Sequence, residues 1–219
     1  MRASLADQSL AIALGANLPS PAGDPIATLV AVRPQLEALL AATVRAHHDA
    51  DARGGGPGGA LYAPPCWSPL FATAPVGGPP DQPIYCNAVL LLPQAPQPAA
   101  GDAAALALLQ ALHRLEQCFG RQRRERWGPR SLDLDLLWWG PLIHSGASDE
   151  ALALPHPRWH QRGFVLAPLL AMEQRLGTPL WLPEVPAVGG LASVEALLAA
   201  TSAVDAPPQR LPPRPGWPE

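Results

Sequence analysis

The chain has 219 residues, of which 48% are apolar, and a formal net charge of −3. This length fits one domain with additions, and the apolar content is sufficient for a hydrophobic core. No unbroken apolar run is long enough to cross a bilayer, and residues 1–14 lack the pattern of a signal peptide. The three cysteines are scattered and fit neither a metal site nor a disulfide framework, so we expect a cytoplasmic protein.

Arginine is unevenly distributed along the chain. There is no lysine, and six of the fifteen arginines lie between Arg114 and Arg130. A coding bias explains arginine in place of lysine, but it does not explain this clustering. Because a guanidinium group matches phosphate oxygens with two parallel hydrogen bonds, the cluster favours an anion site. Charge runs are also common on solvated faces, so both interpretations stay open at this point.

The sequence of the first half of the chain predicts a strand, a long helix and then two further strands. The pattern predicts, in chain order, a strand at 8–14, a helix from Pro25 to about Val44, a flexible loop at 49–59, a strand at 67–73, a turn-rich stretch at 74–83, a strand at 84–92 and a proline-rich connection at 93–101. Asp24 and Pro25 are a typical cap and first helical residue.

The second half predicts a helix with one apolar stripe, a further strand and two shorter helices. These elements span residues 102–119, 131–139, 158–172 and 192–200. Together the elements give the order βαββαβ, an α/β (α+β) ferredoxin-like antiparallel sheet flanked by helices. We expect residues 1–203 to form a single domain. Residues 204–219 are rich in proline and predict a loosely ordered tail.

Asp133 and Asp135 carry the strongest local chemical signal. Alternate side chains of a strand share one face, so the two carboxylates point the same way. A divalent cation relieves their repulsion, and magnesium binds in proteins through one or two carboxylates together with substrate phosphates. A half-exposed strand with acids on its wet face is the alternative.

The loop directly upstream of this strand, residues 120–130, holds five of the arginines and Glu125. Arginines beside a carboxylate pair supply both halves of a nucleotide triphosphate site. Pairing with Glu116 and Glu125 accounts for one or two of these arginines, but not for all. Trp127 in the same loop either covers a core edge or stacks on a flat heterocycle. No glycine-rich loop followed by lysine is present, which excludes a P-loop NTPase.

Several segments resemble, in order, the 6-hydroxymethyl-7,8-dihydropterin pyrophosphokinase family of the folate pathway. Residues 126–135, which read RWGPRSLDLD, resemble that family's signature. Residues 13–18 resemble its opening strand and turn, residues 70–77 and 81–88 its pterin-side loop and strand, and residues 155–166 its last nucleotide-side element. The resemblance covers residues 10 to about 170. It implies an enzyme that transfers pyrophosphate from ATP to the hydroxymethyl group of a reduced pterin and releases AMP.

The resemblance also implies roles for individual residues. Asp133 and Asp135 would hold two Mg²⁺ ions, and the catalytic arginines would be Arg121 and Arg130. The residues implied to contact ATP are Glu116, Arg123, His156 and Arg162. The residues implied to line the pterin pocket are Thr73, Val76, Tyr85, Asn87, Trp127 and Phe164. From the residues alone, His156 is equally well a turn residue between two prolines, and Phe164 is by default a core residue.

Two rival functions remain open at this stage. A ferredoxin-like module could bind nucleic acid through its arginines, although the negative net charge and the lack of spaced surface aromatics oppose this. Ala72 and Ala74 stand where the family usually has arginine and proline, which leaves room for an enzyme of the same fold with a changed substrate. We expect ATP and a reduced pterin as partners, no nucleic acid, no membrane and a monomer.

Overall fold

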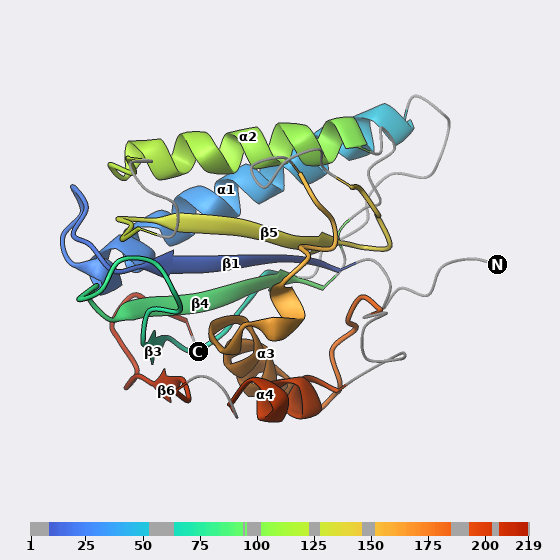
Figure 1. The fold of residues 1–219 in the computed structure, drawn as a ribbon. Coiled ribbons are helices and arrows are strands. Elements are labelled where there is room, and N and C mark those ends of the chain that lie inside the picture. The colour runs from blue at the N-terminus through green and yellow to red at the C-terminus, as the bar shows by residue number, and fades with distance from the viewer. Residues whose placement is uncertain are drawn as a thin grey trace.

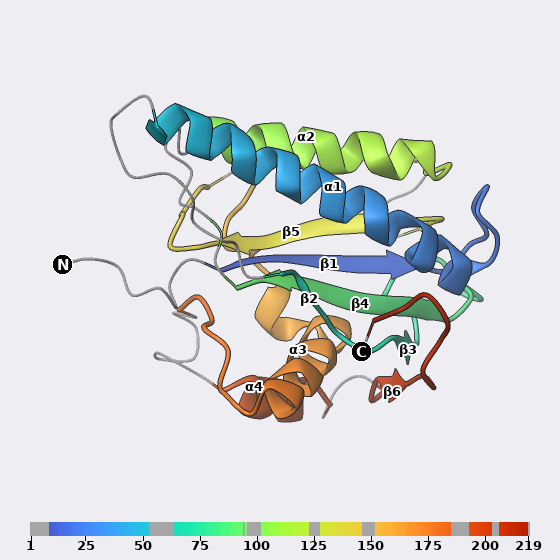
Figure 2. The ribbon, with the colours of Figure 1, turned by 180° about the vertical axis from the view of Figure 1, so that it is seen from behind.

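A single antiparallel sheet runs through the middle of the molecule, with helices on both of its faces (Figures 1 and 2). The computed structural model describes residues 9–52, 64–93, 95, 102–122, 128–145, 152–184, 193–202 and 206–218. The strands are β1 (Leu10–Ala16), β2 (Cys66–Trp67), β3 (Phe71–Thr73), β4 (Tyr85–Leu92), β5 (Asp133–Trp139) and β6 (Gln209–Arg210). Their order across the sheet is β5-β1-β4-β3-β6, and β2 also pairs with β4.

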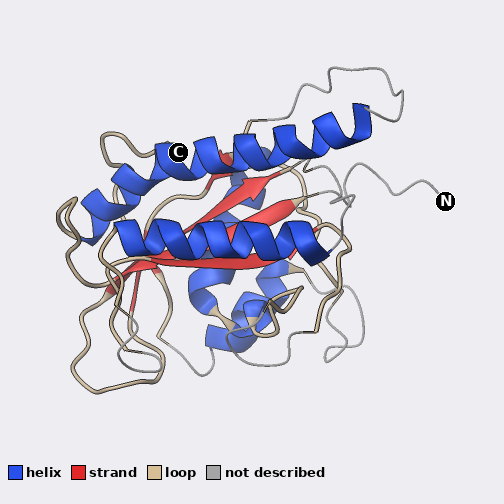
Figure 3. Cartoon of the chain, turned by 90° about the horizontal axis from the view of Figure 1, so that it is seen from above, coloured by secondary structure: helices blue, strands red, loops and turns tan. Residues whose placement is uncertain are grey.

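Two pairs of helices cover the two faces of this sheet. The long helices α1 (Pro25–Ala52) and α2 (Asp102–Cys118) lie side by side on one face, as Figure 3 shows from above. The shorter helices α3 (Gly163–Leu176) and α4 (Val194–Ser202) pack against the other face, and a 3-10 turn at Trp159–Gln161 precedes α3. The predicted ferredoxin-like arrangement is confirmed, and α3 and α4 add a second helical layer to it.

The strands separate two hydrophobic cores because their side chains alternate between the two faces. In β1, Leu10, Ile12 and Leu14 face α1 and α2, whereas Ala11 and Ala13 face α3 and α4. β5 alternates in the same way at first, with Leu134 and Leu136 toward α1 and α2. Asp133 and Asp135 occupy the alternate positions, so the strand directs both carboxylates toward the α3 face. The fold thereby brings the candidate metal ligands to the same side as the 154–164 segment.

The strand predicted at 67–73 is divided into β2 and β3. Pro69 lies in the interruption and has no N–H group to donate to a ladder. The Ser68 hydroxyl oxygen accepts the Val89 N–H at 2.9 Å, and this bond takes the place of a backbone acceptor from the interrupted strand. Both short strands still pair with β4, so the predicted topology is retained.

Helix α1 extends to Ala52, beyond the predicted end near Val44, so the first four residues of the predicted 49–59 loop are helical. The remainder of that loop lies outside the described residues. Residues 25–45 have the length and hydropathy of a membrane span, and 28% of the relevant window is buried in the protein. Leu29, Val32 and Leu36 form the face of α1 that packs into the core. This core-facing side accounts for part of the apolar character of α1.

The C-terminal segment differs from the loosely ordered tail predicted for 204–219. Within the described residues 206–218, β6 pairs with the edge strand β3, and Trp217 is buried at 6% exposure. The indole N–H of Trp217 donates to the Ser68 carbonyl at 2.8 Å, and its ring packs edge-on against Trp67. Prolines in this segment do not prevent docking, because an edge strand requires few N–H donors and one tryptophan provides the buried apolar surface.

Candidate active site

A cleft of about 120 Å³ opens on the α3 face of the sheet. Strands β1, β4 and β5 form its floor, and the segments 73–77, 82–87 and 156–165 form its walls. Gly15 leaves room for the Asn87 side chain over β1, because a Cβ at this position would lie 2.8 Å from Oδ1 of Asn87. One cavity therefore contains the charged carboxylates of Asp133 and Asp135 at one side and the neutral amide of Asn87 at the other.

The carboxylates of Asp133 and Asp135 form the acidic side of the cleft. Both Arg121 and Arg130 are ion-paired with Asp133, and Arg121 also pairs with Glu116. Burial and, to a smaller extent, the neighbouring charge of Asp133 raise the pKa of Asp135 to about 7, against the opposing effect of Arg130, Arg121 and Arg158. Asp135 therefore keeps a proton more readily than an ordinary carboxyl group, mainly because it is buried.

The chemistry of these two carboxylates fits a magnesium ion. Oδ1 of Asp133 is buried and accepts no hydrogen bond from the described residues, although it lies beside the Arg121 guanidinium. No group of three His, Cys, Asp or Glu side chains suited to a metal occurs in the part of the chain that the structure describes. Two hard oxygen donors without a third protein ligand suit a cation that completes its octahedron with water and substrate phosphate.

Arg130 is fixed from both its backbone and its side chain. Its carbonyl accepts the N–H groups of Asn17 and Leu18 at 2.9 and 3.0 Å, and its own N–H donates to Oδ1 of Asn17 at 2.7 Å. Burial acts to lower the pKa of Arg130, but Asp133 and Asp135 raise it more strongly, so the guanidinium stays charged. The Asn17 side chain also donates to the Pro83 carbonyl at 3.1 Å, which ties the 74–83 loop to the same point.

The opposite wall of the cleft is formed by amide, hydroxyl and aromatic groups. Asn87 donates from Nδ2 to the Thr73 hydroxyl at 2.7 Å, and both side chains are buried. The Tyr85 hydroxyl donates to the Gly128 carbonyl at 3.3 Å, and burial raises the pKa of this phenol. Phe164 lies at the edge of the cavity with the Arg162 guanidinium 5.9 Å from its ring centre. These groups form a pocket suited to a flat ring with polar edges.

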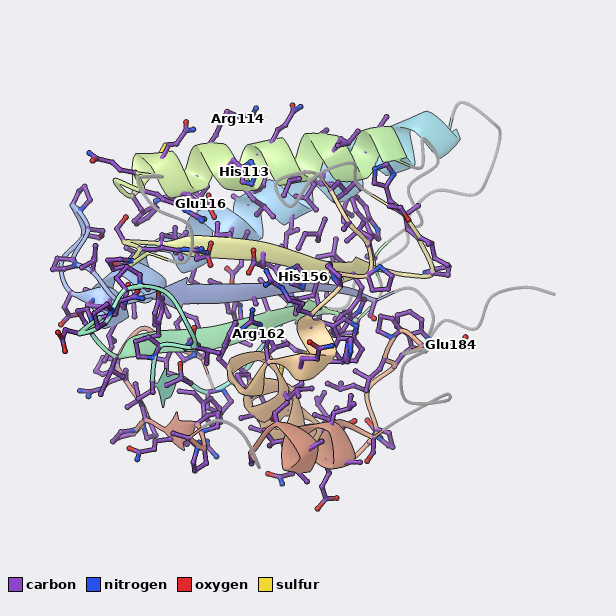
Figure 4. All side chains as sticks on the ribbon, viewed as in Figure 1. His113, Arg114, Glu116, His156, Arg162 and Glu184 are labelled. Carbon is purple, nitrogen blue, oxygen red and sulfur yellow. The ribbon has the colours of Figure 1, made fainter. Side chains whose placement is uncertain are left out.

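His156 is held as a neutral imidazole beside two arginines. Burial, together with the charges of Arg158 and Arg162, lowers its pKa to about 4. The Arg158 backbone N–H donates to Nδ1 at 3.2 Å, an arrangement that places the ring proton on Nε2. In Figure 4, His156 and Arg162 lie on the same side of the sheet, between β1 and the start of α3.

Glu116 lies apart from the main cleft. It projects from α2 and is 1% exposed, and its Oε1 accepts the Leu134 N–H at 2.8 Å. With His113, Gln117 and Arg121 it lines a second cavity of about 240 Å³. Figure 4 shows Glu116 and His113 on α2, above β5. Arg121 contacts Glu116 in this second cavity and Asp133 of the cleft, and so connects the two regions.

Most of the residues implied by the resemblance meet in the main cleft. Those that line it are Thr73, Val76, Tyr85, Asn87, Arg130, Asp133, Asp135, His156, Arg162 and Phe164. Glu116 and Arg121 line the second cavity, whereas Arg123 and Trp127 lie outside the described residues.

The sequence reasoning missed two residues of this region. Arg158 lines the cleft, and its positive charge lowers the pKa of both Asp135 and His156. Its signal in the sequence was its place as a cation directly after the His156–Pro157 turn. Asn17 supports the site by contacting the backbone of both loops. A short polar residue after Gly15 reads as an ordinary turn, so no local pattern points to these long-range contacts.

Comparisons with known proteins agree with this geometry. Residues 11–174 match the family model described as 7,8-dihydro-6-hydroxymethylpterin-pyrophosphokinase. A Pseudomonas aeruginosa protein named 2-amino-4-hydroxy-6-hydroxymethyldihydropteridine pyrophosphokinase is 39% identical over 135 residues, which is 61% of this chain and 76% of that protein. The protein of the same name from Haemophilus influenzae is 39% identical over 112 residues, 51% of this chain and 63% of its own length.

A crystal structure of Plasmodium falciparum HPPK-DHPS aligns over 93% of this chain and 48% of that one, with a TM-score of 0.46 and 10% identity. The fold described above rests on the strand pairing and not on this alignment. The family match covers about three quarters of the chain. It includes every described residue that lines the cleft, from Ala13 in β1 to Val165 in α3. This chain therefore belongs to the 7,8-dihydro-6-hydroxymethylpterin-pyrophosphokinase family.

Proposed function

We propose that this chain transfers the terminal pyrophosphoryl group of ATP to 6-hydroxymethyl-7,8-dihydropterin, giving AMP and the pterin pyrophosphate in folate biosynthesis. Family membership supports the reaction class. The observation that carries the proposal is that one cleft joins the Asp133–Asp135 pair and its arginines to the Asn87–Thr73 wall. A phosphate site and a heterocycle site on a common floor can bring a hydroxymethyl oxygen to a polyphosphate chain.

The bond changes of this reaction define what the protein must do. The hydroxymethyl oxygen forms a bond to the β-phosphorus, the bond from that phosphorus to the α,β-bridging oxygen breaks, and AMP leaves with the electron pair. The hydroxyl proton passes to solvent or to a nearby base. Transfer of this kind asks for alignment and charge stabilisation more than for covalent participation by the protein. Magnesium held by Asp133 and Asp135 would supply charge neutralisation on the phosphate oxygens.

The phosphate side is assigned to the arginines and to His156. Arg130 is locked by its backbone contacts to Asn17 and Leu18, so its guanidinium is preorganised for charge that develops on the transferred group. Arg162 and Arg158 add positive charge at the other wall of the cleft. Neutral His156 offers an Nε2–H donor to a phosphate oxygen. We assign Arg121 the same role from the far side of Asp133, and Glu116 and Arg123 to the nucleotide.

The pterin side is assigned to the amide and the aromatic groups. Asn87 provides a donor and an acceptor for a pterin edge, and its hydrogen bond to Thr73 fixes which atom faces the cavity. Phe164 offers a ring face, and Trp127 is assigned to the opposite face of the pterin. Tyr85 and Val76 complete the rim of this pocket.

Product analysis tests the proposal. Incubation with ATP, magnesium and the reduced pterin is expected to yield AMP in a one-to-one ratio with pterin pyrophosphate, and ADP as the nucleotide product would refute pyrophosphate transfer. Asp135→Asn is expected to abolish AMP formation. Glu195→Gln is the matched control, because Glu195 is an exposed acid on α4 that does not line the cleft, and its loss should leave activity unchanged.

We further infer a cytoplasmic monomer that uses two magnesium ions and binds neither membranes nor nucleic acid. The support for excluding a nucleic-acid function is that Arg121 and Arg130 turn inward to Asp133 and are 10% and 25% exposed. A filter-binding assay should therefore detect no RNA retention at physiological salt. Light scattering measures the mass in solution, and calorimetric titration with a non-hydrolysable ATP analogue measures how many magnesium ions bind.

A further inference from the structure

The C-terminal segment 206–217 contacts the edge of the sheet next to the cleft, and it lies beyond residues 11–174 that the family model matches. Its strand β6 pairs with Phe71 and Ala72 of β3, and the Leu211 N–H donates to the Leu70 carbonyl at 2.8 Å. Thr73 is the next residue of β3, and its hydroxyl accepts the hydrogen bond from Asn87 in the cleft. The segment thus supports the strand that carries one cleft residue and orients another.

The same segment also packs against the start of α3. A Cβ at Gly163 would lie 3.4 Å from Cγ of Pro208, so the proline ring rests directly on the Gly163 backbone. Gly163 is flanked by Arg162 and Phe164, and both of these residues line the cleft. One short segment therefore contacts both β3 and the first turn of α3, the two elements that bound the aromatic and amide side of the cavity.

Trp217 anchors the segment at its far end. It is buried, donates to the Ser68 carbonyl, and has its ring centre 5.1 Å from that of Trp67. Gly216 has a φ of +80° and would place a Cβ 3.0 Å from Val30, so the turn into Trp217 requires glycine both for its conformation and for space. The segment is consequently fixed at both β6 and Trp217.

We propose that segment 206–217 is a positioning element for the pterin-side wall, which sets the placement of β3 relative to the start of α3. The identity of the bound ring rests on the proposed function. The sheet order β5-β1-β4-β3-β6 places β6 at the opposite edge from Asp133 and Asp135. Loss of the segment should therefore weaken pterin binding most and leave Asp133, Asp135 and their paired arginines in place, with Arg162 as the one phosphate-side residue that adjoins the segment's contact at Gly163. A general loss of structure would not produce this pattern.

Steady-state kinetics of a protein ending at residue 205 provide the test. We expect the KM for the pterin to rise roughly tenfold or more while kcat and the KM for ATP change by less than about threefold, because misplacement of a binding wall acts on the ligand that it contacts. Trp217→Ala should reproduce the effect, and Trp217→Phe should largely rescue it by restoring the ring contact with Trp67. Pro213→Ala, an exposed change in the same segment, is the matched control. A fall in kcat with an unchanged pterin KM would overturn the proposal.

Addition in trans separates positioning from damage to the fold. A synthetic peptide of residues 206–219, added to the shortened protein, should lower the pterin KM toward the full-length value, and the same peptide carrying Trp217→Ala should not. If the shortened protein does not fold, Leu211→Pro replaces it, because proline removes the N–H that bonds to Leu70 and leaves Trp217 in place. A pterin KM for Leu211→Pro equal to that of the full-length protein would then refute the positioning role.

Hydrogen exchange distinguishes failure of this inference from failure of the proposed function. If the full-length protein forms no AMP, the proposed function fails, and the segment is judged by amide exchange alone. Faster exchange in residues 71–73 and 163–166, with β5 unchanged, supports the positioning role. Unchanged exchange in those residues after removal of the segment overturns it.

Discussion

Asn17 contributes more to the site than its place in a turn indicates. It is 2% exposed, and its side chain accepts from the Arg130 N–H and donates to the Pro83 carbonyl. Each end of one amide therefore holds one of the two loops that flank the cleft. Leaving either loop group unpaired in a buried position costs about 1–3 kcal/mol, which is sufficient to shift a loop.

Substitution of Asn17 should separate the two loops kinetically. Asn17→Asp keeps the acceptor for Arg130 but loses the donor to Pro83, so we expect a higher pterin KM with kcat reduced less than about fivefold. Asn17→Ala loses both bonds and should lower kcat as well, by roughly ten- to a hundredfold. Steady-state kinetics with each substrate varied in turn measure both effects. Thr28→Val, which removes a buried hydroxyl outside the cleft, is the control, and equal effects of Asp and Ala would contradict the division of roles.

The two carboxylates of β5 should respond in opposite directions to neutralisation. Asp135 is desolvated and repelled by Asp133, so Asp135→Asn should stabilise the magnesium-free protein by on the order of 1 kcal/mol. Asp133 is the carboxylate that pairs with both arginines, so Asp133→Asn should destabilise it by about 1–3 kcal/mol. Urea unfolding in the presence of a chelator measures both values. Two changes of the same sign would show that the repulsion is not the dominant interaction of Asp135.

His156 should make the free energy of unfolding fall at acidic pH. Its pKa in the folded protein is about 4, below the usual 6.5, so between these values the unfolded chain binds a proton that the folded chain does not. His156 therefore lowers the free energy of unfolding in acid: the loss is absent above pH 6.5 and grows as the pH falls toward 4, to about 1–3 kcal/mol in total. His156→Gln should flatten this part of the profile of unfolding free energy against pH. His144→Gln serves as the control histidine, and identical profiles for wild type and His156→Gln would contradict the shifted pKa.

At the residue scale, the sequence located the charged residues that line the cleft better than the residues that hold the surrounding loops. Asp133, Asp135 and the arginine loop carry unusual charge within a few residues, so a local pattern reveals them. Arg158 has only the weak signal of a single cation after a turn, and Asn17 has none, because its importance comes from contacts with residues far along the chain. Glu116 remains a prediction for the nucleotide side, and it accepts the Leu134 N–H and pairs with Arg121 in the second cavity.

At the element scale, the predicted order of strands and helices is confirmed, and the differences have local causes. The interruption at Ser68 and Pro69 shows that one missing N–H and one side-chain acceptor divide a strand whose apolar pattern is continuous. The docking of 206–217 was missed because its apolar surface resides in Trp217, with support from Leu211, among many prolines. Composition averages over a segment, whereas docking depends on where a single large side chain can be buried.

Gly120 offers a test of how α2 is terminated. It follows the helix with a φ of +79°, and its N–H donates to the Gln117 carbonyl. Gly120→Ala should destabilise the protein by about 1 kcal/mol, because the left-handed conformation is strained for a residue with a Cβ. Space is not the cause, since the new Cβ would lie 3.4 Å from Pro21. Chemical denaturation should show a smaller loss for Gly120→Asn, which tolerates this conformation better, and equal losses would point to steric crowding instead.

At the scale of the whole molecule, the site lies against the hydrophobic core between the sheet and helices α3 and α4. Ligand binding should therefore stabilise the folded protein as a whole. Magnesium with a non-hydrolysable ATP analogue is expected to raise Tm by several degrees at a concentration far above Kd, through mass action on the native state. The double variant Asp133→Asn with Asp135→Asn should lose most of this shift, as measured by differential scanning calorimetry. The control Glu195→Gln should keep it. A full shift in the double variant would remove the two carboxylates from nucleotide binding.

The central position of β1 has a consequence for how the chain reaches this structure. Leu10 pairs with Leu92 and Gly15 pairs with Asp133, so both neighbours of the first strand come from distant parts of the chain. A large loop must close before either pairing forms, and folds dominated by such pairings reach the native state in milliseconds to seconds. Until β5 has paired with β1, one edge of β1 can pair with a strand of another chain. Refolding yield should consequently depend on protein concentration, with aggregation competing for the strand that forms the floor of the cleft.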